Sequence, residues 1–107
     1  MEISLIIRTR PDNEPRTALA LSFIAEAIEQ GHTIRQCFFQ SEGVLSATQP
    51  GRLAAWQRVA DKTGAELLLC SQAAEVHEVN ASGAFQIGGL GALVEAAVRS
   101  DRVISFV

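Results

Sequence analysis

The 107-residue sequence has no tyrosine, one methionine, one tryptophan and only two cysteines, Cys37 and Cys70. These two cysteines are far apart in the sequence, with no CxxC pair and no histidine at metal-ligand spacing, which argues against a disulfide scaffold and against a structural zinc site. We therefore expect neither a metal nor a cofactor. Any cysteine chemistry must come from a single thiol.

The sequence also lacks a strong charge of either sign, because 12 acidic residues against 9 basic residues give a net charge of −3. Without a basic excess, direct nucleic-acid binding is not expected. No apolar run approaches the roughly 20 residues that span a bilayer, and Met1 leads straight into a strand-like segment instead of a signal sequence. These absences predict a cytoplasmic protein, and the length predicts one domain over residues 1–107.

Short apolar runs alternate with segments of helical periodicity along the chain. Strands are predicted at residues 3–7, 33–39, 66–70 and 102–107, and helices at residues 15–30, 53–63 and 90–98, with weaker helical turns at 73–77 and a turn at 80–83. A long connection at residues 40–51 is rich in small and turn-forming residues. Strands too apolar to have a solvated face predict an α/β fold in three layers, a flavodoxin-like or Rossmann-like parallel sheet of four to five strands with helices on both faces.

In open parallel sheets, ligands and reactive groups gather beyond the carboxyl ends of the strands, where the strand order reverses. With a flavodoxin-like order, the second strand lies outside the first and the third lies on its other side. The crevice would then lie between strands one and three, at residues 8–10 and Cys70. Cys37 would lie toward the edge of the sheet, too far from Cys70 for a disulfide, and is interpreted as a small core residue.

Cys70 has two interpretations. Free cysteine is among the most buried residue types and often acts as a small hydrophobic side chain. However, Cys70 ends the apolar run at residues 67–69 and is followed by polar Ser71 and Gln72. A helix beginning at that point would favour the thiolate, which is the nucleophilic form, so this position suits a nucleophile.

Other residues near these strand ends have a functional and a simpler interpretation. A protonated His77 near Cys70 would lower the pKa of the thiol, whereas a lone histidine is more often solvated. Arg10 would orient a sulfur species or merely solvate a loop. The glycine run at residues 88–91, with Gly89 and Gly91, would cradle phosphate at a helix N-terminus, but it lacks the full GxGxxG or GxxxxGK[ST] pattern. Close helix packing explains these glycines better.

Three segments together resemble the DsrE/DsrF family, and most closely its TusD/DsrE branch: FFQSEGV at residues 38–44, the strand that ends at Cys70, and FQIGGLGAL at residues 85–93 with DRV at 101–103. The resemblance covers nearly the full chain. It implies a sulfurtransferase that carries sulfur: Cys70 accepts sulfane sulfur as a persulfide and relays it to a partner protein, in tRNA wobble-uridine thiolation or dissimilatory sulfur metabolism. Glu42 and Gly43 lie in the family-like turn, where Glu42 either orders the crevice or is simply a turn residue.

The resemblance also implies trimers or hexamers, built from one kind of chain or with DsrF/TusC-like and DsrH/TusB-like partners. One segment departs from the family pattern, because a basic pair after the cysteine is missing and Glu75 and Glu78 stand in this stretch. If close to the thiol, these carboxylates would raise its pKa. Two alternatives stay open: an inactive scaffold subunit of a DsrEFH/TusBCD-like complex, and a flavodoxin-like phosphate or nucleotide binder that uses residues 88–91.

Overall fold

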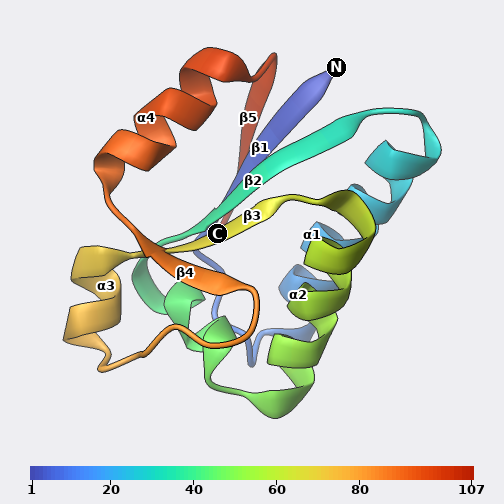
Figure 1. Ribbon diagram of the computed structural model, residues 1–107. Coiled ribbons are helices and arrows are strands. Elements are labelled where there is room, and N and C mark those ends of the chain that lie inside the picture. Colours follow the sequence, from blue (N-terminus) through green and yellow to red (C-terminus); the bar gives the residue numbers. More distant parts are fainter.

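The strands and helices expected from the sequence form one parallel sheet of five strands with helices on both faces (Figure 1). The computed structural model describes residues 1–107. In chain order the elements are β1 (Glu2–Ile7), α1 (Glu14–Glu29), β2 (Thr33–Phe39), the 3-10 helix η1 (Ser41–Ala47), α2 (Pro50–Thr63), β3 (Glu66–Cys70), α3 (Ser71–Val76), β4 (Phe85–Gly88), α4 (Leu90–Arg99) and β5 (Arg102–Phe106). The α/β class and the parallel sheet are therefore confirmed.

Local sequence signals explain where the long helices begin and end. The side chain of Asn13 caps α1 by accepting a hydrogen bond from the backbone N–H of Arg16, and a proline lies in the first turn of both α1 and α2. The C-cap of α2 is Gly64, whose φ of 73° is the left-handed conformation that glycine adopts without strain. The stop predicted at this glycine is confirmed.

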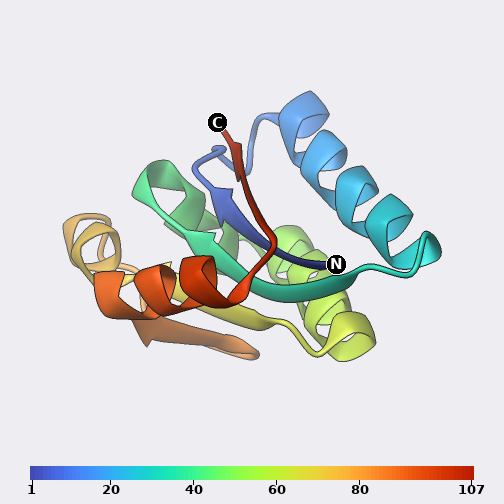
Figure 2. The same cartoon turned by 90° about the horizontal axis from the view of Figure 1, so that it is seen from above.

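The hydrophobic core lies mainly between the sheet and the two long helices. Figure 2 shows α1 and α2 on one side of the sheet and α4 on the other. Phe39 and Trp56 lie at the centre of the core layer between the sheet and the helices α1 and α2. Their ring centroids are 4.9 Å apart in an edge-to-face arrangement. Most of the other buried apolar side chains of this core come from the three central strands and from α1: Ile3, Leu5, Ile7, Ala20, Ile24, Ala27, Ile34, Cys37, Leu67 and Leu69.

The strand order is β4-β3-β2-β1-β5, so the flavodoxin-like order expected from the sequence is wrong. Because α1 and α2 lie on the same face, right-handed crossovers move the chain in one direction from β1 through β2 to β3. The chain continues to β4 at the edge and only then returns past β1 to β5, with α4 on the opposite face. The order reverses between β1 and β5, and β2 separates the first strand from the third.

This order also corrects the place of Cys37. It lies in β2, the central strand, opposite Leu5 on one side and Leu67 on the other, and not toward the edge of the sheet. Its side chain is fully buried, as expected for a core residue. Both cysteines are free.

Two further local differences concern short elements. The connection at residues 40–51 is not an irregular loop, because most of it forms η1 and the start of α2. Residues 85–88 form β4, a strand that the sequence pattern did not predict. Four residues that end in glycine are too few to show an alternating pattern, so this strand forms because β3 offers it a hydrogen-bonding edge.

Candidate functional site

Cys70 is the last residue of β3 and the N-cap residue of α3, at the carboxyl edge of the sheet (Figure 1). Its side chain is half-buried, whereas the thiol of Cys37 is fully buried. Burial raises the pKa of Cys37 to about 12, because a charged thiolate is poorly solvated in the core. Of the two thiols, only Cys70 is accessible to another molecule.

The residue opposite Cys70 on the neighbouring strand is Gly88. A β-carbon at this glycine would lie 2.9 Å from a terminal methyl carbon of Leu68, so a glycine lets β4 pack closely on β3. At Gly89 and Gly91, by contrast, an added β-carbon would meet no atom within 4 Å. The helix-packing interpretation of the glycine run is therefore wrong: Gly88 packs closely against a neighbouring strand, and Gly89 and Gly91 have no close neighbour.

On the other side of Cys70, the chain leaves β2 and enters η1. Gln40 follows Phe39, the register partner of Leu69, so the end of β2 lies beside the end of β3. The 3-10 helix η1 then packs against β3 and α3. Cys70 is therefore framed by the start of α3, by η1 and by the glycine end of β4.

The position of η1 depends on Gly43. A β-carbon here would lie 2.1 Å from the backbone oxygen of Ile7, so no other residue fits without moving the backbone. The N–H of Gly43 donates to the carbonyl of Gln40 at 2.9 Å, and the N–H of Gln40 donates to the carbonyl of Ile7 at 2.9 Å. Gly43 thus ties η1 to the end of β1.

Arg10 forms ion pairs with two carboxylates. Its Nη1 pairs with Glu42 in η1, and its Nε donates to Asp12 Oδ1 at 3.0 Å. The hydrogen bonds that Arg10 donates to Asp12 and then to Glu42 raise the pKa of Arg10, and the same guanidinium lowers the pKa of Asp12. The structure therefore brings Arg10 and Glu42 together. The pair lies after the ends of β1 and β2, whereas Cys70 ends β3. The guanidinium of Arg10 is therefore already paired with the carboxylates of Asp12 and Glu42.

His77 lies at the far end of α3 from Cys70. It is the C-cap residue of this helix, and its backbone N–H donates to the carbonyl of Ala73 at 3.0 Å. Seven residues of helical rise separate its backbone from that of Cys70 by roughly 10 Å. Nothing in the structure brings the imidazole to the thiol.

A groove of about 370 Å³ begins beside Cys70 and runs along α3 to β4. Glu75 and Glu78 are exposed at this groove, one and two turns beyond the thiol. Ile87 of β4, 49% exposed, lines the groove as well. Sequence reasoning missed Ile87 and Gly88 as neighbours of Cys70, since both lie on the strand that it did not predict.

Neither a metal cluster nor a membrane span is found. No group of three or more His, Cys, Asp or Glu side chains is arranged to hold a metal ion. None of the helices combines the length and the apolar character that crossing a bilayer requires.

Comparisons with known proteins agree with the fold. The chain is 32% identical to a protein of Cronobacter sakazakii named sulfurtransferase TusD, with 99% of this chain and 100% of the relative covered. It is 31% identical to a protein of Allochromatium vinosum named putative sulfurtransferase DsrE, with 99% and 98% covered. The crystal structure of the YchN protein from E. coli has the same fold, with a TM-score of 0.83, 14% identity and 99% of each chain covered.

Both sequence alignments extend over 128 positions, more than the length of this chain, because the relatives contain additional residues. The DsrE/DsrF-like family matches residues 1–106. With a family match over essentially the whole sequence and relatives above 30% identity, the chain belongs to the DsrE/DsrF-like family.

Proposed function

We propose that this chain is a sulfur carrier that accepts sulfane sulfur on Cys70 as a persulfide and relays it to a partner protein. The observation that carries the proposal is the half-buried Cys70 at the carboxyl end of β3, the one accessible thiol in a chain whose relatives are named sulfurtransferases. The fully buried Cys37 takes no part, since its thiol neither ionises readily nor meets another protein.

The chemistry consists of two thiol exchanges. In the first, the thiolate of Cys70 attacks the outer sulfur of a donor persulfide, a new S–S bond forms on Cys70, and the donor leaves as a thiolate that takes up a proton. In the second, an acceptor thiolate attacks the outer sulfur on Cys70, and Cys70 leaves as a thiolate. No oxidant or reductant is consumed, because the sulfur keeps its oxidation state in both steps.

The surroundings of Cys70 suit these exchanges. The residue is the N-cap of α3, so it lies beside the first backbone N–H groups of the helix, which have no partner within the helix. Open space at Gly89 leaves room for an incoming thiol on the β4 side. We propose that Gly43 and the Arg10–Glu42 pair do not touch the sulfur but position its surroundings, because they hold η1 against the end of the sheet.

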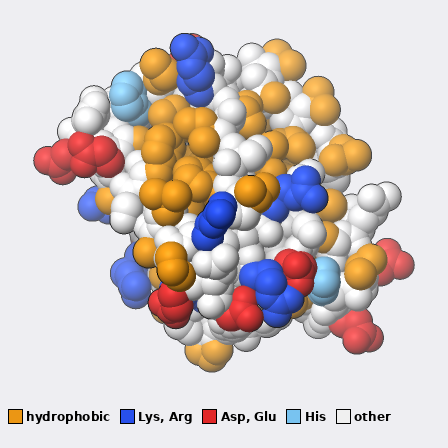
Figure 3. All heavy atoms as spheres, turned by 180° about the vertical axis from the view of Figure 1, so that it is seen from behind, with side chains coloured by type: hydrophobic (Ala, Val, Ile, Leu, Met, Phe, Trp, Pro, Cys, Tyr) orange, Lys and Arg blue, Asp and Glu red, His pale blue; other side chains and the backbone are white.

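A relay needs contact with other proteins, and the apolar face of α4 offers a surface for it. Leu90, Val94 and Val98 follow one another at helical spacing and are 58%, 60% and 80% exposed. Ala96, on the opposite side of the helix, is the residue buried against the sheet. On the side of the molecule seen in Figure 3, further hydrophobic side chains gather chiefly in the upper half. Exposed apolar stripes of this kind are typical of interaction surfaces.

We propose that another α/β subunit covers this stripe in a relay complex. The stripe begins two residues after Gly88, the register partner of Cys70. A subunit docked on α4 would therefore border the reactive sulfur. The resemblance implies either tRNA wobble-uridine thiolation or dissimilatory sulfur metabolism as the route that the sulfur takes.

The experiment is to incubate the protein with a persulfidated carrier protein or with polysulfide and to measure intact and peptide masses. Wild type, Cys37→Ser and Cys70→Ser are compared. We expect a gain of one sulfur, about 32 Da, on Cys70 in the first two proteins, reversed by reductant and absent from Cys70→Ser. A Cys70 that reacts with iodoacetamide yet never gains sulfur would overturn the proposal in favour of a scaffold subunit.

A further inference from the structure

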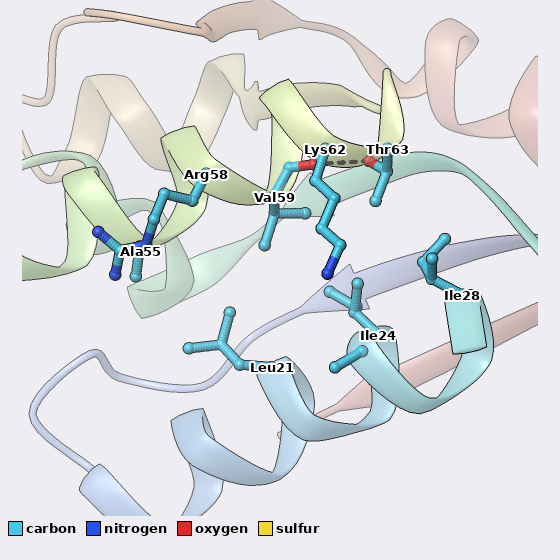
Figure 4. Close-up of a pocket in the computed structure, with 9 residues that line it drawn as sticks. Leu21, Ile24, Ile28, Ala55, Arg58, Val59, Lys62 and Thr63 are labelled. Carbon is cyan, nitrogen blue, oxygen red and sulfur yellow. Dashed lines mark hydrogen bonds between the residues drawn. The ribbon is translucent and has the colours of Figure 1, made fainter.

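A second surface lies on the opposite face of the sheet from α4, between α1 and α2. It is an open groove of about 340 Å³ (Figure 4). Its lining is mostly apolar and comes from the middle and C-terminal parts of both helices: Leu21, Ile24, Ala25, Ile28, Ala55, Arg58, Val59, Lys62 and Thr63.

The groove exists because α1 and α2 pack on the sheet and only slightly on each other. Ile24 of α1 is buried against the core, whereas Leu21, Ile28 and Val59 are only half-buried. These three side chains leave an apolar floor exposed between the helices. Nothing else in the chain covers it.

The only charged side chains that line the groove are Arg58 and Lys62. Both are exposed, and neither forms an ion pair within the chain. They stand four residues apart on α2, a spacing at which like charges repel and destabilise a helix. Figure 4 shows the amino group of Lys62 pointing across the groove toward α1. In a chain with a net charge of −3, two unpaired cations beside an apolar floor form a distinct positive site.

We propose that this groove binds an amphipathic helix of a partner protein, with apolar side chains between α1 and α2 and acidic side chains facing Arg58 and Lys62. Leu21 and Ile28 are separated by two helical turns, about 10 Å, which is the distance between anchor residues i and i+7 of a docked helix. A pair of acidic residues at i and i+4 on that helix matches the spacing of the two cations.

The shape of the groove favours a helix over a small ligand. Small-molecule sites enclose most of the ligand surface, whereas here only Ile24 is a buried lining residue and both cations are exposed. The groove also lies over the amino-terminal half of the sheet, because the C-terminal ends of α1 and α2 lead into β2 and β3. Cys70 stands at the carboxyl edge. A partner bound in the groove therefore leaves the thiol free.

The test uses synthetic helical peptides that are fluorescently labelled and measured by anisotropy. One peptide carries leucines at i, i+3 and i+7 with glutamates at i and i+4 on the flank, and a matched peptide carries lysines in place of the glutamates. We expect the acidic peptide to bind wild type at least tenfold more tightly than the basic peptide. NMR shifts should fall on α1 and α2.

Charge reversal provides the matched variants. In Arg58→Glu/Lys62→Glu the preference should invert toward the basic peptide, while Arg102→Glu, an exposed cation on β5, should behave as wild type. Equal binding of both peptides, or binding unchanged in the double variant, would refute the proposal. So would decanoate shifting the groove resonances at lower concentration than the peptide does, because the site would then take a small carboxylate.

This test does not depend on sulfur transfer. Circular dichroism and the rate of Cys70 alkylation, measured on the same variants, check that the fold and the distant thiol are unchanged. Failure of peptide binding with normal persulfide loading removes the groove proposal alone. Failure of persulfide loading with normal peptide binding removes the sulfur-carrier proposal alone.

Discussion

Cys70 lies directly opposite Gly88 in the parallel pairing of β3 with β4. The accessible thiol therefore has a residue without a side chain as its neighbour across the strand. This glycine also lets β4 approach Leu68 closely. The same residue therefore allows close packing at the edge of the sheet and leaves the space beside the sulfur free of a side chain.

Replacing Gly88 by valine should lower stability and slow reactions of Cys70. The new β-carbon would lie 2.9 Å from Leu68 Cδ1 and 3.2 Å from Leu68 Cβ, which forces the edge strand outward. We expect a loss of about 1–3 kcal/mol in the free energy of unfolding, measured by urea denaturation. Gly91→Ala in the first turn of α4 is the control, since its β-carbon meets no atom within 4 Å, and it should leave stability unchanged or slightly higher and the alkylation rate unchanged. Equal effects of the two substitutions would contradict this explanation.

Replacing Gly43 by alanine should be more damaging than a single added methyl group suggests. The β-carbon would lie 2.1 Å from the backbone oxygen of Ile7, and backbone cannot move aside as a side-chain end can. We expect about 2–3 kcal/mol of destabilisation and slower persulfide loading, because η1 shifts. Gly51→Ala, in the first turn of α2 with open space around it, should leave stability unchanged or slightly higher. A neutral Gly43→Ala would show that η1 is not anchored there.

The buried thiol of Cys37 should make the protein less stable in alkali. Its pKa is raised to about 12 in the folded state, against about 8.5 for an unfolded chain. A group with a raised folded pKa contributes stability that is complete below the unfolded value and is lost as pH rises toward the folded one. We expect the unfolding free energy to fall between about pH 8.5 and 12, and this component of the fall to be absent in Cys37→Ala. A slope that persists in Cys37→Ala must come from another group.

The two cysteines should also differ in reactivity. Iodoacetamide at pH 8 is expected to label Cys70 alone in the folded protein and both cysteines in denaturant, since Cys37 is fully buried. Peptide mass spectrometry locates the label. Labelling of Cys37 before Cys70 would mean that the accessible thiol has been assigned to the wrong residue.

Placing a charge on the α4 stripe should prevent assembly without unfolding the subunit. Val94→Glu puts a carboxylate on a side chain that is 60% exposed, so the folded subunit tolerates it, whereas a buried subunit interface does not. Sedimentation velocity should show smaller species for this variant. Leu19→Glu, at a side chain 59% exposed on α1, is the matched control and should assemble as wild type does. Unchanged assembly of Val94→Glu would exclude α4 from the interface.

Several parts of the fold were predictable from local signals. The bounds of β2 and β3 agree with the structure, because a glycine shortly before each strand and a polar residue directly after it limit the strand at both ends. The end of α2 at Gly64 was equally clear from its glycine. β4 was not predictable, since its four residues hydrogen bond to an edge that only the folded sheet provides.

In the candidate site, too, some features were predictable from the sequence and others were not. Cys70 was identified from its place at the end of an apolar run, and its partial exposure agrees with that place. His77 looked close in sequence but lies at the far end of α3. Arg10 and Glu42 are 32 residues apart and yet form an ion pair, which no spacing in the sequence indicates.

The sequence by itself determined the α/β class, the parallel sheet, the central strands and the cysteine at the end of a strand, because hydrophobic periodicity and turn residues act over a few neighbouring positions. Only the tertiary structure decided the strand order, the place of Cys37 in the central strand and the pairing of Cys70 with Gly88. Those features depend on which face of the sheet each helix covers. That choice is made by packing among segments far apart in the chain, where local patterns carry no information.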